Sequence, residues 1–293
     1  MQFDPVPVVS FFPRFSTDHE GGSVPIRKPH PKRINISLFR FLFFLFVIGC
    51  VAVMPWQGSA QAEPPKTAEE LMRMVDDLWR GKNSHAKMTM TVKTKRYERT
   101  LKIEAWSEGT EKSLMQILAP KKDRGVATLK VEKNIWNYLP KVNRVTKIPA
   151  SMMMGSWMGS HFTNDDLVKE SSFEKDYMSE LSFTGSREGK EIYEVTSMPR
   201  PEAAVVWGKV VTIVTQKDLL PVKALYYDEE GVLARELVFL EPKQFGSRTV
   251  PAVLRLTSTE KPGEHTTVRY DSLTYDLKLP VDLFSLRRLR SGR

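Results

Sequence analysis

Apolar and polar residues alternate strictly in Met88-Thr89-Met90-Thr91-Val92-Lys93, and the pattern returns in Leu101-Lys102-Ile103-Glu104-Ala105. A period of two places every second side chain on the same face, as in a half-buried β-strand. Short turn sequences such as Glu108-Gly109 and Lys261-Pro262-Gly263 separate many of the later runs. The sequence therefore predicts a mainly β domain of consecutive antiparallel strands, either a sandwich or a barrel. The further strand-like runs are Leu114–Leu118, Val126–Val131, Ile135–Leu139, Ile192–Thr196, Val205–Thr215, Val222–Tyr227, Val232–Leu240, Ala252–Thr259, Thr266–Tyr270 and Leu273–Tyr275.

Several of the predicted strands are apolar on both faces. Trp136 and Tyr138 point to one face of their run, while Ile135 and Leu139 point to the other. The run Val232–Leu240 repeats this pattern. Such a sheet needs a cover on each face, because large exposed apolar patches are rare in soluble proteins. Helices or a bound apolar ligand can supply that cover.

One helix is predicted where the domain begins. Thr67 can cap the free backbone N–H groups, and Glu70, three residues on, completes a capping box. Gly81 is the expected end of the helix. Between them lies one apolar stripe at helical spacing, formed by Leu71, Val75, Leu78 and Trp79.

The first 62 residues have the features of an irregular extension followed by a secretory signal peptide. Basic residues around 27–33 precede an unbroken apolar run, Phe41–Met54, and the segment ends in Ala60-Gln61-Ala62. The run is shorter than the roughly 20 residues of a membrane span. We predict cleavage after Ala62, a soluble periplasmic product and a single domain over residues 63–293. An uncleaved anchor is one alternative, and a lipid anchor through Cys50 is another, because residues 47–50 resemble a lipobox.

Charge and cysteine content exclude several classes of function. Residues 1–62 hold six of the 44 Lys/Arg and three of the 35 Asp/Glu, which leaves 38 basic and 32 acidic residues in the predicted mature chain. These are interspersed along the strands and do not form the concentrated stripe of a nucleic-acid-binding protein. The single cysteine, Cys50, lies in the predicted signal, so the mature chain has no disulfide, no thiolate nucleophile and no cysteine metal site.

A methionine-rich segment interrupts the strand pattern at residues 149–162. Methionine adapts to irregular apolar shapes and recurs at promiscuous binding surfaces. Combined with glycine and serine, it is typical of a mobile apolar flap, although a connector packed against the sheet is the alternative. Directly after it, Thr163 and Asp166 can cap a short helix through Leu167-Val168. The apolar residues of the segment are Met152, Met153, Met154, Trp157, Met158 and Phe162.

Catalytic motifs are not found in the predicted mature chain. His85, His161 and His265 lie far apart in sequence without metal-ligand spacing. No Gly-x-Ser-x-Gly, HExxH or phosphate-loop sequence occurs. The pair Asp165-Asp166 is explained by a helix start. We therefore expect no enzymatic activity, no cofactor and no metal site.

Several motifs together resemble the outer-membrane lipoprotein-sorting (LolA-like) proteins, and in particular their large uncharacterised branch. The resemblance spans residues 67–289 and is most specific where Met-Gly-Ser-Trp-Met-Gly-Ser leads into Phe-Thr-Asn-Asp-Asp-Leu, at residues 154–167. The other matching features are the opening helix, the run Leu129–Pro140, Arg144 and the ending Asp282-Leu283-Phe284-Ser285-Leu286.

This resemblance implies an unclosed, strongly curved antiparallel β-barrel with a helical, methionine-rich lid and an apolar interior for acyl chains. It also implies a periplasmic carrier, or chaperone, that moves a lipoprotein or lipid toward the outer membrane, with an inner-membrane exporter of the resistance-nodulation-division type as partner. We expect a monomer that binds no nucleic acid. The six apolar residues of 152–162 would form the lid, with Trp106, Trp136 and Tyr138 in the cavity wall. The alternative is a lipid-binding sensor or accessory domain for a membrane partner.

Overall fold

The computed structural model describes residues 65, 67–169, 176–203 and 205–291. The chain divides into two units, Met1–Ala62 and Glu63–Arg293. The first unit lies outside the described residues, and so do the predicted signal peptide, its cleavage point after Ala62 and Cys50.

Thirteen antiparallel strands form one sheet in the described part of the chain. Their order is β6-β5-β4-β3-β2-β1-β13-β12-β11-β10-β9-β8-β7. Nearly all neighbours are consecutive in sequence, and the exception, β1 beside β13, joins the first strand to the last. The strands are β1 (Asn83–Lys93), β2 (Glu98–Glu108), β3 (Lys112–Ala119), β4 (Ala127–Val131), β5 (Asn134–Leu139), β6 (Arg144–Lys147), β7 (Tyr177–Arg187), β8 (Lys190–Pro199), β9 (Lys209–Thr215), β10 (Pro221–Tyr227), β11 (Leu233–Phe245), β12 (Arg248–Ser258) and β13 (His265–Tyr275).

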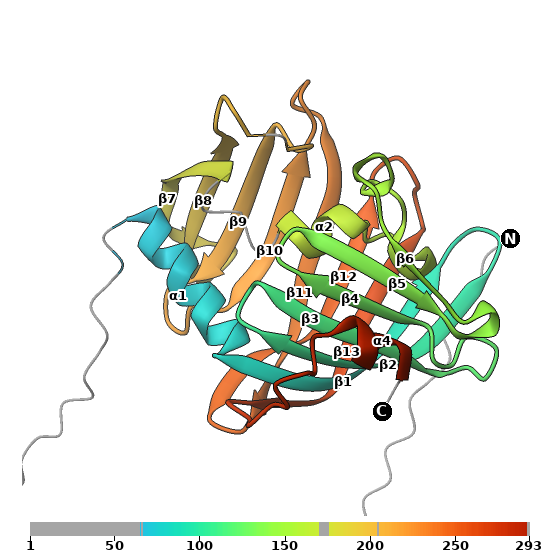
Figure 1. The fold of residues 1–293 in the computed structure, drawn as a ribbon. Helices are drawn as coiled ribbons and strands as arrows, with labels where there is room; N and C mark the ends of the chain where they lie inside the picture. Colours follow the sequence, from blue (N-terminus) through green and yellow to red (C-terminus); the bar gives the residue numbers. More distant parts are fainter. Residues whose placement is uncertain (1–64, 66, 170–175, 204, 292–293) are drawn as a thin grey trace, which may run out of the picture. The chain divides into compact units, whose positions relative to one another are not determined.

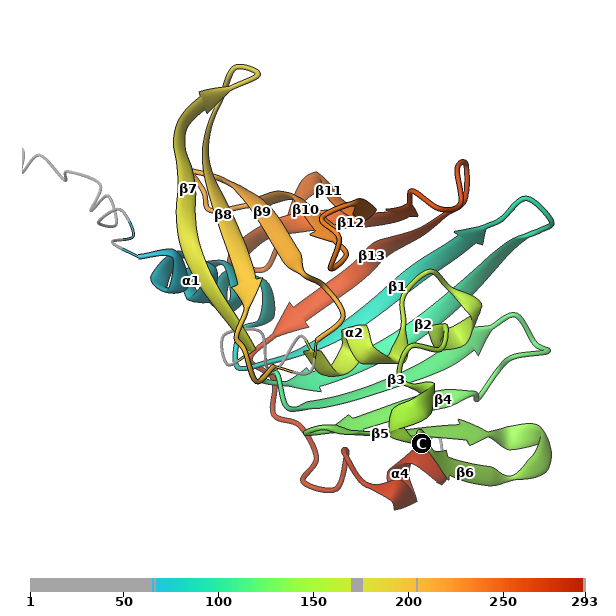
Figure 2. The same cartoon turned by 90° about the horizontal axis from the view of Figure 1, so that it is seen from above.

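The sheet curls strongly but does not close, and β6 and β7 remain as its two edges (Figure 1; Figure 2). This confirms the predicted unclosed, curved antiparallel fold. In the described residues, three helices accompany the sheet: α1 (Ala68–Arg80), α2 (Asn164–Lys169) and α4 (Leu286–Ser291). Short 3-10 turns are η1 (Pro140–Val142), η2 (Ala150–Met152) and η3 (Trp157–Gly159).

Helix α1 begins and ends as predicted. The Thr67 side chain accepts a hydrogen bond from the Glu70 N–H at 3.1 Å, and Gly81 follows the last turn with a φ of 63°, a conformation that favours glycine. Leu71 and Val75 are buried against Val195 and Val214 of β8 and β9. The helix therefore covers the concave face on the β7–β9 side of the sheet.

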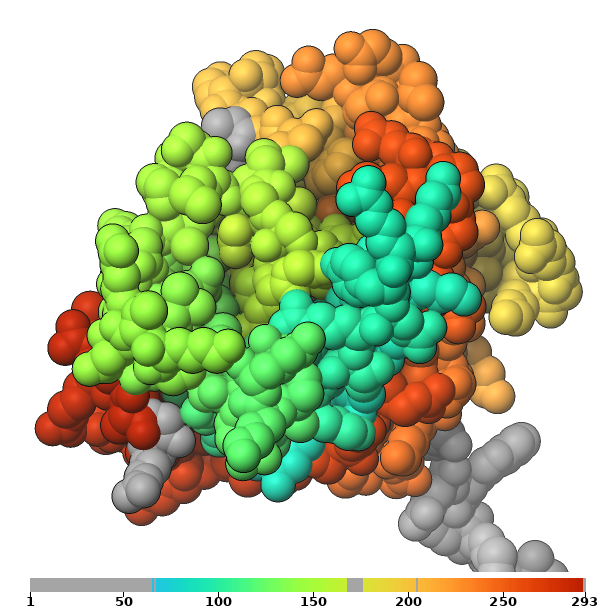
Figure 3. All heavy atoms as spheres, turned by 90° about the vertical axis from the view of Figure 1, so that its right-hand side faces the viewer, coloured from blue at the N-terminus to red at the C-terminus, as the bar shows by residue number. Residues whose placement is uncertain are grey.

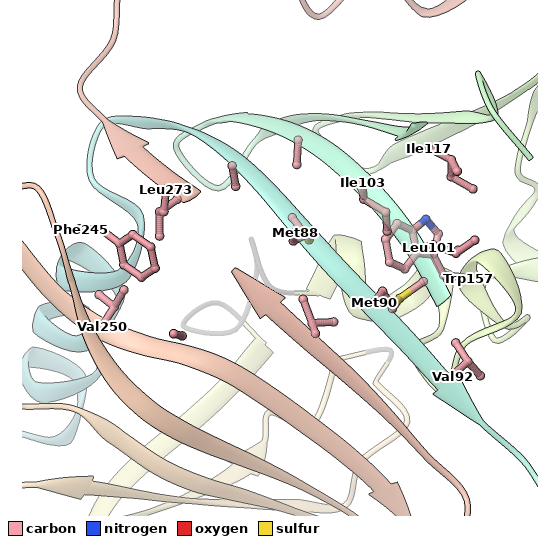
Figure 4. Packing of buried hydrophobic residues seen from close by; sticks show 14 residues of the cluster. Met88, Met90, Val92, Leu101, Ile103, Ile117, Trp157, Phe245, Val250 and Leu273 are labelled. Atoms are coloured by element: carbon pink, nitrogen blue, oxygen red, sulfur yellow. The ribbon is translucent and has the colours of Figure 1, made fainter. Parts of the chain in front are cut away.

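The β1–β5 side of the sheet is covered on both faces. On the concave face, Met88, Met90, Leu101 and Ile103 form a cluster with Trp157 (Figure 4). On the convex face, Leu114 and Leu129 pack against the carboxy-terminal segment through Leu283 and Leu289. Cross-strand pairs keep the two sets apart, because Leu114 pairs with Leu129 while the next pair, Met115 with Thr128, points to the other face.

Candidate functional site

The candidate site is the concave face of the sheet, between α1 and the segment Pro149–Lys169, which we call the lid segment. Inward-pointing side chains of β11–β13, including Phe239, Leu254 and Tyr270, are partly exposed. Trp79 of α1 meets Phe239 and Tyr270 edge-to-face, each with ring centroids 5.9 Å apart. The apolar interior is thus shared by residues from α1 and the middle of the sheet.

The lid segment is held in a defined conformation by its own hydrogen bonds. Ser156 and Thr163 form a β-bridge, and the Trp157 N–H donates to the Phe162 carbonyl at 2.8 Å. The buried Asn164 side-chain amide donates to the carbonyls of Met152 and Gly155 at 3.2 and 3.1 Å. The segment is therefore a hydrogen-bonded double turn and not an extended loop.

The six apolar residues predicted for the lid occupy different environments. Trp157 is only 5% exposed, and its indole N–H donates to the Thr128 hydroxyl at 3.2 Å on the concave face. Met158 and Phe162 are partly buried against the same cluster. Met152 and Met154, by contrast, are 56% and 49% exposed, and Met153 is intermediate. One end of the segment packs on the sheet, and the other end lies at the surface.

Three polar contacts fix the turn at Trp157–Phe162. The Met158 carbonyl accepts a hydrogen bond from Arg99 at 3.4 Å, and Arg99 also pairs with Asp123 at 3.0 Å. His161 contacts the buried Thr266 hydroxyl at 2.8 Å through Nδ1 and lies 3.5 Å from Glu264 through Nε2. A hydrogen bond from the Lys95 backbone N–H, and to a smaller extent one from His161, lowers the pKa of Glu264. The turn is thus joined to β2 through Arg99 and to the start of β13 through Thr266 and Glu264. Water could replace each of these polar contacts.

Helix α2 follows the turn and is capped as the sequence predicts. The Asp166 N–H donates to the Thr163 hydroxyl at 3.1 Å, and the Thr163 N–H donates back to the Asp166 carboxylate at 2.8 Å. The same carboxylate accepts two hydrogen bonds from Arg235 of β11, at 2.9 and 2.5 Å. Asp166 therefore both starts the helix and joins it to the opposite half of the sheet.

Arg235 is buried on the concave face between two aromatic rings. Its guanidinium lies 4.3 Å from the ring centroids of both Trp207 and Tyr226. Burial alone would lower the pKa of Arg235, but the Asp166 carboxylate more than offsets it and raises that pKa. Its Nε atom, buried as well, has no hydrogen-bond partner in the described residues. The charge is held by one carboxylate and two ring faces.

A cavity of about 120 Å³ lies beneath α2 and the end of α1. Met88 and Ala105 of the sheet, Met115 of β3, Leu167 of α2 and Trp79 of α1 give it apolar walls. Cationic side chains border it as well, namely Arg80, Lys112 and Lys130. Arg80 pairs with Asp76 and Lys112 pairs with Glu108, so the cavity has apolar walls and a charged border.

The predicted wall residues Trp106, Trp136 and Tyr138 are not brought together with the lid segment. All three pack against the convex-face cluster that the carboxy-terminal segment covers. Trp106 alone among them also borders the cavity, and its ring stacks on His85 with centroids 5.1 Å apart. Their contact with a ligand stays a prediction.

Sequence reasoning missed Arg235 and Thr128. Arg235 had a visible signal: it interrupts the apolar series Leu233, Leu237 and Phe239, which recurs at every second position. A charged residue at an inward position of such a run requires a partner inside the protein. Thr128 carried no such signal, because threonine is common in strands.

In the described part of the chain, no cluster of three His, Cys, Asp or Glu side chains is arranged to hold a metal ion. Nor does that part contain a helix long and apolar enough to cross a membrane.

A DUF1329-like family model, described as an uncharacterized protein, matches residues 109–291, which is more than half of the chain. The chain belongs to this DUF1329-like family. A search of curated proteins found no match for this DUF1329-like chain.

Solved structures share the fold of this DUF1329-like protein over about three quarters of its length. A DUF1329 family protein from Desulfovibrio piger has a TM-score of 0.69 at 21% identity, covering 75% of this chain and 96% of that one. A domain named for outer membrane lipoprotein sorting, from Vibrio parahaemolyticus, has a TM-score of 0.66 at 23% identity, with 75% and 97% covered. A LolA superfamily protein from Nitrosomonas europaea has a TM-score of 0.64 at 20% identity, with 76% and 99% covered. The DUF1329-like chain therefore has a LolA-like fold.

Proposed function

We propose that this protein is a non-enzymatic periplasmic carrier that binds the acyl chains of a lipid or lipoprotein on the concave face of its sheet. The main support is the arrangement of that face, where partly exposed apolar residues lie between two separate covers. A rigid structural module would fill this space with side chains at close packing. Each methylene removed from water would contribute roughly 0.8 kcal/mol to binding.

In this proposal the structure corresponds to a closed state of the carrier, because the space beneath α2 is small for an acyl chain. Pockets that hold drug-sized ligands measure about 300–1,000 Å³, whereas the space beneath α2 is about 120 Å³. A long acyl chain can enter only if one of the covers moves. In this proposal Trp157, Met158 and Phe162 form the underside of the moving cover and contact the ligand.

Lys130 at the cavity border favours an amphipathic ligand with an acidic group. Lys130 is a buried lysine, with only 3% of its surface exposed. Its ammonium donates to the Thr110 carbonyl at 2.5 Å. A carboxylate or phosphate at the head of an acyl chain would meet favourable charge there.

The direction of transport is proposed by analogy with one fold relative, and the partner is proposed from the resemblance of the sequence to lipoprotein-sorting proteins. The Vibrio parahaemolyticus domain is named for outer membrane lipoprotein sorting. We infer that this chain likewise moves its cargo toward the outer membrane as a monomer, receiving it from an inner-membrane exporter of the resistance-nodulation-division type. The predicted signal peptide supports a periplasmic location. Transfer of a fluorescent lipid between two vesicle populations would separate this carrier role from a sensor role.

Native mass spectrometry of protein purified from a cell extract that contains membranes tests whether the protein binds acyl chains. We expect a bound acylated molecule in the wild type and its loss in Ala105→Phe, which fills the cavity. Thr100→Phe is the matched control, because Thr100 is exposed on the outward face of the same strand. Folding of each variant is checked by its thermal transition, since overpacking costs roughly 1–3 kcal/mol. Wild-type protein that carries no acyl molecule and binds no fatty-acyl probe would contradict the proposal.

A further inference from the structure

Three turns lie side by side at one end of the β1–β6 half of the sheet. They join β1 to β2, β3 to β4 and β5 to β6, and consecutive antiparallel hairpins bring alternate turns to the same end. Figure 3 views this end directly, with the three turns in teal, green and lime around the yellow-green lid segment. We call this surface the basic end, for its exposed residues Lys95, Arg96, Lys121, Lys122, Arg124, Lys141 and Arg144.

The charge of the basic end is largely uncompensated. None of its seven cations forms an ion pair with any residue that the structure describes. Within residues 94–98, 119–126 and 139–144 the acidic residues are Glu98 and Asp123, and Asp123 pairs with Arg99. The seven like charges therefore act together on whatever approaches.

The opposite end of the same strands has no such excess. Its turns, residues 108–112 and 131–134, contain Lys112 and Lys133 against three acidic residues, and Lys112 pairs with Glu108 at 2.7 Å. In the other half of the sheet, the β10–β11 turn is acidic, with Asp228, Glu229 and Glu230. Exposed positive charge is thus concentrated at one end of the half that carries the lid segment.

Apolar side chains project from the same turns. Tyr97 is 49% exposed in the β1–β2 turn, and Val142 is 64% exposed at the tip of the β5–β6 turn, beside the exposed Leu139. The two turns at the opposite end contain no large exposed apolar residue. Apolar tips flanked by lysine and arginine suit the boundary between lipid headgroups and acyl chains.

We propose that the basic end docks on the surface of an anionic phospholipid bilayer. Lysine and arginine near such a surface are attracted to its negative potential, and Tyr97, Leu139 and Val142 would insert among the headgroups. Arg99 links this surface to the lid, because it pairs with Asp123, between Lys122 and Arg124, and donates to the Met158 carbonyl. Docking would therefore place the lid segment next to the membrane from which cargo is taken or to which it is given. Docking itself needs no cargo. Only the purpose that we give it, exchange of cargo with the membrane, rests on the proposed function.

Flotation of the residue 63–293 chain with liposomes tests the proposal. We expect it to float with phosphatidylglycerol-containing vesicles, to stay behind with pure phosphatidylcholine vesicles, and to be released by 0.5 M salt, where the Debye length falls to roughly 4–5 Å. The test variant is Lys121→Glu/Lys122→Glu/Lys141→Glu. Each basic residue contributes about fivefold to partitioning, so affinity should fall at least about a hundredfold.

The matched control is Lys133→Glu/Lys190→Glu/Lys217→Glu, which makes the same change in net charge at exposed positions outside the basic end, where β4 meets β5, β7 meets β8 and β9 meets β10. This control should keep most of the binding. Equal losses in both triple variants would show only general charge attraction and overturn the proposal. A wild-type protein that does not bind the vesicles would also overturn the proposal. This holds even if an acidic protein is found to bind the basic end instead. Native mass spectrometry of both variants reports acyl content separately, so a failure of docking is distinguishable from a failure of the carrier function.

Discussion

Helix α1 and the lid segment both lie on the concave face, but the residues that they bury differ in kind. The buried residues of α1 are Ala68, Leu71 and Val75, all apolar. Those of residues 149–167 in the lid segment, where burial is described, are Trp157, Ser160 and Asn164, two of them polar. Apolar burial is lost when a cover leaves the sheet, whereas water can replace hydrogen bonds at a net loss of only about 1 kcal/mol each. We therefore propose that α1 stays in place and that the lid segment is the cover that moves.

The connections of the two covers to the sheet support this difference. The end of α1 is held by Arg248 of β12, which donates to the carbonyls of Asp77 and Leu78. That interaction complements the negative end of the helix dipole. The lid segment is joined to the far half of the sheet mainly through Asp166 and Arg235.

Leu71→Ala should lower the free energy of unfolding by about 4 kcal/mol, toward the upper end of the range for buried leucines, because Leu71 is fully buried. Urea denaturation measures the loss. The affinity of the folded variant for an acyl probe should change little. Intact stability with lost binding would mean that α1, and not the lid segment, is the moving cover.

Asp166→Ala should loosen the lid segment by about 3 kcal/mol, because it leaves the Arg235 charge buried without its carboxylate. Hydrogen exchange of the 157–169 amides should accelerate by roughly a hundredfold, while the α1 amides keep their protection. Adding Arg235→Met should restore much of the protection, because the unpaired charge is then gone. Uniform acceleration across both covers would argue against separate movement.

Met158→Gly should change the free energy of unfolding by less than about 1 kcal/mol. Met158 has a φ of 50°, which glycine adopts without strain, and this relief offsets the lost apolar contacts. Acyl-probe affinity should nevertheless fall several-fold, as measured by fluorescence titration, because the ligand contact is removed. Unchanged affinity would remove Met158 from the proposed contact set.

Met152→Ser/Met154→Ser should have the smallest effect, within about 0.5 kcal/mol in stability, because both side chains are about half exposed. It serves as the matched control for Met158→Gly. A stability loss above 2 kcal/mol, determined by thermal unfolding, would mean that the outer part of the lid segment is packed against another element.

The sequence predicted the strands that have one apolar face and missed those that do not. Edge strand β7 was overlooked because Ser179 and Gly185 occupy positions of its less exposed face and Met178 occupies its exposed face, which obscures the alternation. An edge strand also needs less apolar surface. Val205–Thr215 was predicted as one strand, but β9 begins only at Lys209. The apparent break between Tyr270 and Leu273 is wrong as well, since β13 runs through it with a register shift opposite Lys87 and Met88.

The candidate site could be predicted only where local chemistry determines it. The caps at Thr67 and Thr163 depend on residues three positions away, so both were visible in the sequence. The pairing of Asp166 with Arg235 spans 69 residues, and the face to which Trp136 and Tyr138 point depends on what the carboxy-terminal segment covers. Tertiary contacts of this kind leave no local pattern.

Photo-crosslinking with a diazirine-labelled fatty acid, followed by peptide mass spectrometry, tests the central claim most directly. If the acyl chain lies on the concave face beneath the lid segment, adducts should form on Met88, Met115 and Leu167, which line the cavity. An excess of unlabelled fatty acid should suppress them. Adducts concentrated instead on Trp136 and Tyr138, on the convex face beneath the carboxy-terminal segment, would contradict the claim.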